Sequence, residues 1–176
     1  MKTFYSLLIC ILLFTANKSF GSHAAGGELV YQHISGNTYR LTLKMYRDCS
    51  GIGMPSSYTL CAKNMCTNGV VNVTLPLMAT LPGGGANGNP ISTGCPGYPT
   101  TCNGGTLIGY RQYWYQADYV LPAGCNQFTF SVTECCRNTA ITNLTNPGGN
   151  NIYLEAYLNR ALGENNSPTF TNIPLA

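Results

Sequence analysis

Eight cysteines restrict the fold of this chain more than any other feature of its sequence. The chain has 176 residues and nine cysteines, of which Cys10 lies in an amino-terminal apolar stretch. The other eight are Cys49, Cys61, Cys66, Cys95, Cys102, Cys125, Cys135 and Cys136. An even number of cysteines in an exported chain is typical of a disulfide framework. We therefore expect four disulfide bonds, which leave no thiolate for a metal ion or for nucleophilic chemistry.

Residues 1–21 have the composition of a secretory signal peptide. Lys2 supplies the positive start, and the apolar stretch from Phe4 to Phe14 is too short to span a bilayer comfortably. Ser19 and Gly21 place small side chains at the positions that signal peptidase recognises. We expect cleavage after Gly21 and a mature chain that is secreted or held at the cell surface by way of the Sec route.

The pairing of the cysteines is not fixed by the sequence, because eight cysteines allow about 105 pairings. Short spacing favours bridges from Cys61 to Cys66 and from Cys95 to Cys102, with long-range bridges for the rest. Adjacent residues of an extended chain point to opposite faces. We therefore expect Cys135 and Cys136 to bond to different partners.

The charge of the mature chain argues against nucleic acid as a partner. Without Lys2 and Lys18, seven Lys and Arg residues stand against six Asp and Glu residues. This balance gives no basic footprint for a phosphate backbone. No second apolar segment approaches the roughly 20 residues of a membrane span. One soluble domain is the simplest expectation for residues 22–164.

Alternating apolar residues predict strands along most of this domain. Tyr39–Arg47 alternates most clearly, and it follows Glu28–His33 across Ser35-Gly36-Asn37, a sequence that favours a tight hairpin turn. Five more segments are predicted as strands, namely 58–62, 71–75, 108–121, 128–132 and 152–158. No stretch shows sustained helical spacing with capping residues. The pattern predicts an all-β, immunoglobulin-like β-sandwich, with a barrel as the alternative.

A long Gly/Pro-rich loop interrupts the strands between Leu81 and Gly105. Gly83, Gly85 and Gly88 formally match a dinucleotide-binding fingerprint, but Pro90 and the residues after it cannot form the required helix. A surface loop that is either functional or disordered is the better interpretation. Residues 165–176, which include Pro168 and Pro174, are predicted to be a linker or the start of a following module.

The sequence offers no catalytic, cofactor-binding or metal-binding residues that stand out. Only His23 and His33 could complete a mixed zinc site, and secretion oxidises free thiols. There is no Gly-x-Ser-x-Gly motif and no recognisable base for a nucleophile. A glycosidase pair could come from the six carboxylates, but nothing singles out two of them. We therefore expect a protein that is not an enzyme.

The aromatic segment around Trp114 is the one candidate for a binding surface. Alternation places Trp114 on the face opposite to Tyr113 and Tyr115, so one face belongs to the core. We interpret the other as a tyrosine-bearing surface. Tyr113 and Tyr115 are thus the candidate residues for stacking on sugar rings, together with the Gly-rich loop.

Several ordered motifs resemble the amino-terminal module of large secreted Bacteroidota proteins. They are SHAAGGEL at 22–29, YRLTL at 39–43, YRDCSG at 46–51, CCRN at 135–138, AITN at 140–143 and NSPTF at 166–170. Proteins of that family commonly continue into PKD or other Ig-like repeats and end in a gliding-motility-associated sorting domain recognised by the type IX secretion system. The resemblance implies downstream domains in a longer cell-surface protein.

Three hypotheses for function follow from these features. The preferred one is a non-catalytic module of a cell-surface or adhesin-like protein, with an unidentified surface protein or glycan as partner. The second is a carbohydrate-binding module that uses Tyr113 and Tyr115. The third is a secreted hydrolase.

Overall fold

The computed structural model describes residues 24–82, 84–91, 97–138 and 141–168, which form an all-β structure. No α-helix is present in these ranges, and two short 3-10 turns lie at Thr101–Asn103 and Pro147–Gly149. Every strand predicted from the sequence is confirmed. The strands are β1 Ala24–Ser35, β2 Thr38–Asp48, β3 Ser57–Asn64, β4 Val70–Pro76, β5 Tyr110–Val120, β6 Gln127–Cys135 and β7 Asn151–Asn159.

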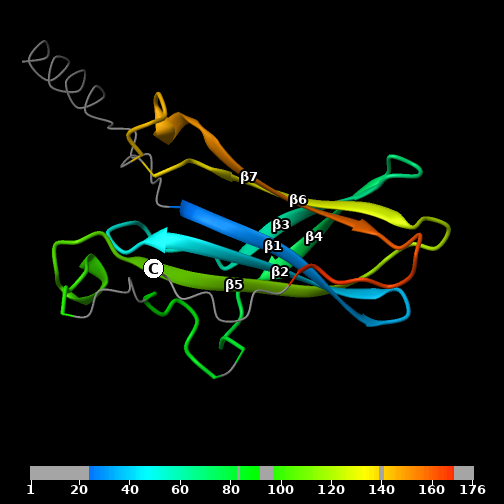
Figure 1. Ribbon diagram of the computed structural model, residues 1–176, viewed down its shortest axis with the longest axis horizontal. Coiled ribbons are helices and arrows are strands. Elements are labelled where there is room, and N and C mark those ends of the chain that lie inside the picture. Colours follow the sequence, from blue (N-terminus) through cyan, green and yellow to red (C-terminus); the bar gives the residue numbers. More distant parts are fainter. Residues whose placement is uncertain (1–23, 83, 92–96, 139–140, 169–176) are drawn as a thin grey trace, which may run out of the picture.

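The strands form two antiparallel sheets that pack face to face (Figure 1). One sheet has the order β1-β2-β5 and the other β4-β3-β6-β7. The predicted all-β sandwich is therefore confirmed, whereas its immunoglobulin-like character stays a prediction. Such a sandwich is stable because each sheet buries one apolar face against the other and leaves the second face in water.

The core lies between the sheets and is built from alternate residues of each strand. From the first sheet, Leu41, Leu43 and Tyr115 point inward with no exposed surface. Phe130 and Leu158 meet them from the second sheet and are equally inaccessible. Val71 departs from the expected pattern, because it is 48% exposed near the start of β4. In β4, contact with the core therefore begins two residues later, at Val73, and Leu75 is fully buried.

The β1–β2 hairpin follows the turn sequence that predicted it. Gly36 has a φ of 51°, in the left-handed region that a side chain disfavours. The two strands then pair from Ser35 opposite Thr38 back to Ala24 opposite Arg47. β2 pairs on its other side with β5 over its whole length. The β1–β2 register shifts between Ala24 and Gly26 and between His33 and Ser35, and is regular from Gly26 to His33. The registers of both pairs fix which side chains of the sheet face the core and which face solvent.

Two long-range disulfides connect loops to the sandwich. Cys49, just after β2, bonds to Cys102 in the first 3-10 turn, 53 residues away. Cys66, in the β3–β4 turn, bonds to Cys125 in the turn before β6, 59 residues away. The expected bridges from Cys61 to Cys66 and from Cys95 to Cys102 are therefore wrong. Antiparallel strands bring distant turns together at the same end of a sheet, and residue spacing alone does not reveal this.

The remaining cysteines differ from expectation as well. Cys135 and Cys136 bond to each other, which contradicts the prediction of separate partners. That prediction assumed a regular extended chain, but β6 ends at Cys135. Cys61 carries a free thiol and is half-buried on β3. Cys95 lies outside the described residues, but because Cys61 is free, the prediction of four disulfide bonds among these eight cysteines is wrong.

Loss of the Cys66–Cys125 bridge should destabilise the sandwich strongly. Its loop of about 60 residues corresponds to about 4 kcal/mol of lost stability in the chain-entropy model. We expect this loss for a C66A/C125A double variant in denaturant titrations. The matched control is C61S, which removes a free thiol and should change stability by less than about 0.5 kcal/mol. Equal stabilities of the two variants would contradict the importance of this bridge.

Glu134 gives the fold a pH dependence of known sign. Burial raises the pKa of this carboxyl, and the hydroxyl of Tyr58 offsets only part of the effect. A raised pKa in the folded state means that the charged form opposes folding, so this cost is absent in acid and present at neutral pH. E134Q should therefore raise the melting temperature at pH 7 and leave it nearly unchanged below about pH 4. A stabilisation of equal size at both pH values would refute this assignment.

Candidate functional site: the outer face of the β1–β2–β5 sheet

The outward side chains of the first sheet form an ordered polar surface, which we call the outer face. Cross-strand pairing arranges them in rows, such as Glu28 beside Lys44 beside Trp114. Their odd-numbered neighbours, such as Leu43 and Tyr115, fill the core. The outer face consists of Glu28, Val30, Gln32, Arg40, Thr42, Lys44, Tyr46, Gln112, Trp114, Gln116 and Asp118.

The charged groups of the outer face are paired with one another. Arg40 donates two hydrogen bonds to Asp118, at 2.7 and 2.9 Å. The Nζ of Lys44 lies 3.0 Å from Oε2 of Glu28. These two cations and two anions compensate each other, so the outer face presents no net charge. Each ion pair is partly exposed and contributes little to stability.

The titration behaviour of both carboxylates agrees with this pairing. The hydrogen bond from Arg40 lowers the pKa of Asp118 below its ordinary value. Partial burial acts to raise the pKa of Glu28, but hydrogen bonds from Tyr46 and Lys44 outweigh it, and the net pKa is lowered. Both carboxylates are therefore ionised at neutral pH, as the ion pairs require. The same contact and burial raise the pKa of the Tyr46 hydroxyl, which stays protonated and donates.

Trp114 is the aromatic centre of the outer face. Its indole is half-buried, and the Nζ of Lys44 lies 4.7 Å from the ring centroid, within cation–π range. Beside it in the strand are Gln112 and Gln116, and Gln116 donates to the hydroxyl of Thr42 over 2.9 Å. Aromatic surface and amide groups thus alternate along β5.

The outer face is the floor of a groove of about 1690 Å³. Met78 and Pro82 of the segment after β4 border it beyond β5. Beyond β1 it is bordered by Leu154 to Tyr157 of β7 and by Asn166 to Pro168. The segment after β4 projects past β5 on the side away from the second sheet (Figure 1). Pockets for small molecules usually enclose about 300 to 1,000 Å³. The size of this groove therefore suits an extended ligand better than a small one.

The tyrosines predicted to form the binding surface lie on the wrong side of the sheet. Tyr115 has no exposed surface, and its hydroxyl donates to the carbonyl of Pro55 over 2.9 Å. Tyr113 is half-buried against the core and accepts a hydrogen bond from Arg47. The alternation was read correctly, but the sequence did not show which face is the core. Trp114, on the opposite face, is the residue that this reasoning missed.

The described part of the Gly/Pro-rich loop covers the free edge of β5. The side-chain amide of Asn87 donates to the carbonyl of Trp114 over 2.8 Å and accepts from its N–H over 2.9 Å. It thereby pairs with β5 as the backbone of another strand would. Gly88 and Asn89 continue the pairing through hydrogen bonds with Gln112. Part of this loop therefore has a structural role that the sequence did not indicate, namely protection of a sheet edge.

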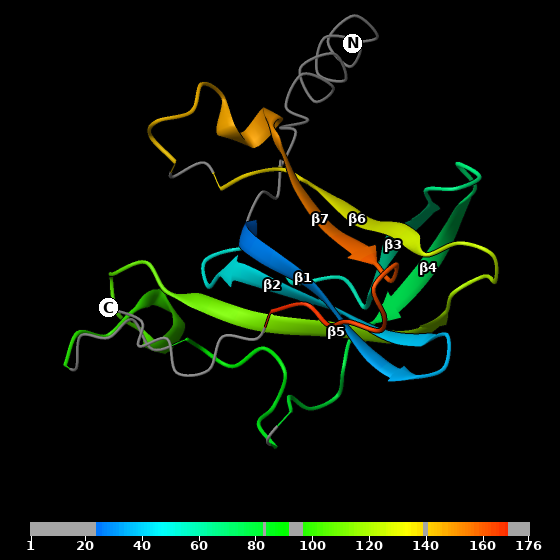
Figure 2. The same ribbon diagram turned by 45° about the vertical axis from the view of Figure 1, so that its right-hand side comes forward.

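The segment that follows β7 protects the edge of β1 on the other side of the sheet (Figure 2). The N–H of Ser167 donates to the carbonyl of Tyr31 over 2.9 Å, and the N–H of Tyr31 donates to the hydroxyl of Ser167. The N–H of His33 donates to the side chain of Asn166 over 2.6 Å. Residues 166–168, predicted from the sequence to belong to a linker or the start of a following module, are thus in contact with the domain.

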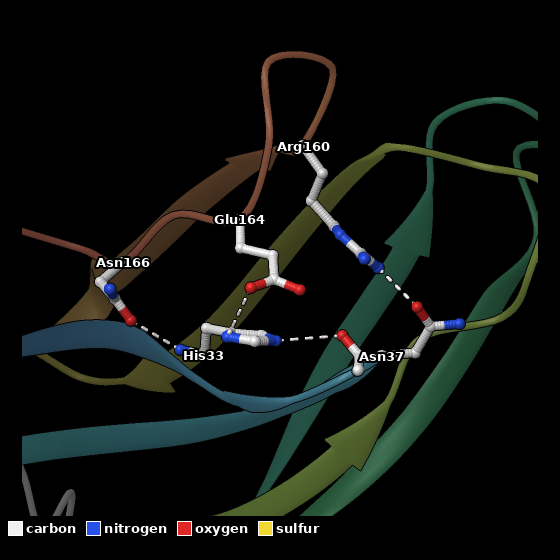
Figure 3. A network of polar contacts seen from close by, with 6 residues as sticks. His33, Asn37, Arg160, Glu164 and Asn166 are labelled. Atoms are coloured by element: carbon white, nitrogen blue, oxygen red, sulfur yellow. Dashed lines mark hydrogen bonds and ion pairs between the residues drawn. The ribbon is translucent and has the colours of Figure 1, made fainter.

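Two side-chain contacts fasten this segment to the β1–β2 turn (Figure 3). Nδ1 of His33 lies 3.2 Å from Glu164, and its Nε2 lies 3.0 Å from the carbonyl of Gly36. Both ring nitrogens therefore lie within contact distance of an oxygen atom. Arg160 donates to the side chain of Asn37 over 2.9 Å. We call this network the clasp.

The carboxylates considered for hydrolysis are dispersed among different partners. Glu28 and Asp118 belong to the outer face, and Glu164 belongs to the clasp. Glu155 accepts a hydrogen bond from Tyr153 on the outward side of β7. Among the described residues, no three His, Cys, Asp or Glu side chains are grouped as metal ligands would be. The part of the chain that the structure describes also contains no helix long and apolar enough to cross a membrane.

Comparisons with protein-family models, with curated proteins and with solved structures give no match for this chain.

The contact between the segment after β7 and β1 can be tested by hydrogen exchange. N166A/S167A removes the acceptors of the His33 and Tyr31 amides, and we expect these two amides to exchange up to about tenfold faster. The amides of Val30 and Gln32, which point toward β2, are the internal control and should keep their rates. Unchanged exchange at Tyr31 and His33 would show that the segment does not cover this edge in solution.

Proposed function

We propose that this chain is a non-catalytic, secreted module of a bacterial cell-surface or adhesin-like protein of the kind associated with gliding motility. The observation that carries the proposal is the pair of long-range disulfides, Cys49–Cys102 and Cys66–Cys125. Bonds of this kind form and persist in oxidising compartments outside the cytoplasm. The signal-like residues 1–21 support the same location.

A binding role is supported by the contrast between the edges of the first sheet and its outer face. Both edges of the first sheet are covered by other segments of the chain, while its outer face stays open. An open polar face on a rigid, cross-linked scaffold is suited to contact with other molecules. Downstream domains, by the resemblance to secreted Bacteroidota proteins, would hold this face at a distance from the cell.

No arrangement among the described residues favours the hydrolase alternative over this proposal. Each of the carboxylates placed above is engaged by a different partner, and a hydrolytic pair would need two of them on either side of one bond. The glycan alternative is supported at the outer face rather than at the two tyrosines.

Export with oxidised cysteines is the decisive test of the proposed function. We expect the protein recovered outside the cytoplasm to start at Ser22 and to gain mass on alkylation mainly after reduction, as measured by intact mass spectrometry. Native alkylation should reach Cys61, and a C61S variant should lose that label. Eight readily alkylated cysteines in the native exported protein, or retention in the cytoplasm with the signal intact, would refute the proposal.

A further inference from the structure

We propose that the outer face of the β1–β2–β5 sheet binds an uncharged polysaccharide chain, with Trp114 as its central contact. This inference rests on the proposed function, because it names the ligand class of an exposed surface module. It assigns the site to side chains on the face opposite to Tyr113 and Tyr115.

The charge of the groove floor points to a neutral ligand. Arg40 is held by Asp118, and Lys44 is held by Glu28. An anionic polymer would have to compete with Asp118 and Glu28 for the two basic groups. A cationic polymer would have to compete with Arg40 and Lys44 for the two carboxylates. A neutral chain leaves these pairs intact and meets a surface of compensated charge.

The hydrogen-bonding groups of the floor match those of sugars. The side-chain amides of Gln32 and Gln112 each carry two donors and one acceptor oxygen. Gln116 has one further donor and its oxygen besides the hydrogen bond to Thr42. The hydroxyls of sugars likewise both donate and accept. The paired ions add further donors and acceptors that are already fixed in place by their partners. This density of oriented polar groups favours a polyhydroxylated ligand over an apolar peptide.

Trp114 supplies apolar surface, which the amide side chains lack. The half-buried indole of Trp114 presents apolar area among polar neighbours, and the C–H face of a sugar ring can pack on such an area. The contact with Lys44, itself bonded to Glu28, restrains the indole in one position. A restrained side chain loses little conformational freedom when a ligand binds.

The dimensions of the groove favour a polymer. β2 lines the groove from Arg40 to Tyr46, a stretch of roughly 23 Å at 3.3 Å per residue. The groove of about 1690 Å³ runs between the segment after β4 and the segment after β7. A single sugar would fill a small part of it, whereas several linked sugars would fill it.

Binding can be measured by affinity electrophoresis of the mature protein in gels that contain a defined polysaccharide. The neutral probes are mixed-linkage β-glucan, xylan and galactomannan, and the acidic probes are polygalacturonate and alginate. We expect retardation by at least one neutral probe, with no loss when salt is raised from about 0.05 to about 0.5 M, because screening weakens only charge attraction. Since Trp114 is the single tryptophan of the chain, its fluorescence should change on binding.

Variants assign the binding to the outer face. W114A should bind about tenfold more weakly, and W114F should retain part of the affinity because it keeps an aromatic ring. Q116A should bind several-fold more weakly with little effect on folding. The matched control is Y98A, which removes a tyrosine that is 66% exposed and does not line the groove, and it should bind as the wild type does.

Three outcomes would overturn the inference. They are the absence of retardation by every neutral probe, a preference for the acidic probes that salt abolishes, and equal affinity of folded W114A and Q116A with the wild type. None of them changes the cysteine and export results that test the proposed function. Conversely, reduced cysteines in the exported protein would reject the proposed function even if a polysaccharide bound.

Discussion

The register of β2 between β1 and β5 is the constraint on which the rest of this structure depends. Because side chains alternate along a strand, a shift by one residue would move Leu41 and Leu43 into water and bring Arg40 and Lys44 into the core. The observed register instead places Leu29, Leu41, Leu43, Met45 and Tyr115 together in the core. The same geometric rule therefore creates both the hydrophobic core and the charge-balanced outer face.

A sheet of three strands has two free edges, and this chain closes each of them with a different device. At β5, the amide of Asn87 replaces the backbone of a missing strand. At β1, Ser167 and Asn166 bond to the strand, and the clasp around His33 holds their segment in place. Covered edges reduce pairing with other chains, so contact with a partner is directed to the open face.

The disulfides act on the loops rather than on the core. Cys49–Cys102 restrains the part of the long loop that leads into β5, and Cys66–Cys125 joins two turns of the other sheet. Strand pairing alone leaves such turns free to open. Together, the covered edges and the bridges give a scaffold on which a broad surface keeps its shape.

The sequence by itself determined the strands, the hairpin at Gly36 and the all-β class, because these follow from alternation and turn chemistry between near neighbours. It also showed that Trp114 and Tyr115 face opposite ways. Tertiary structure decided the rest: which of these faces is buried, which cysteines meet, and that Asn87 and Ser167 complete sheet edges. Each of these depends on contacts between segments distant in the chain. Local residue patterns do not specify which distant segments make contact.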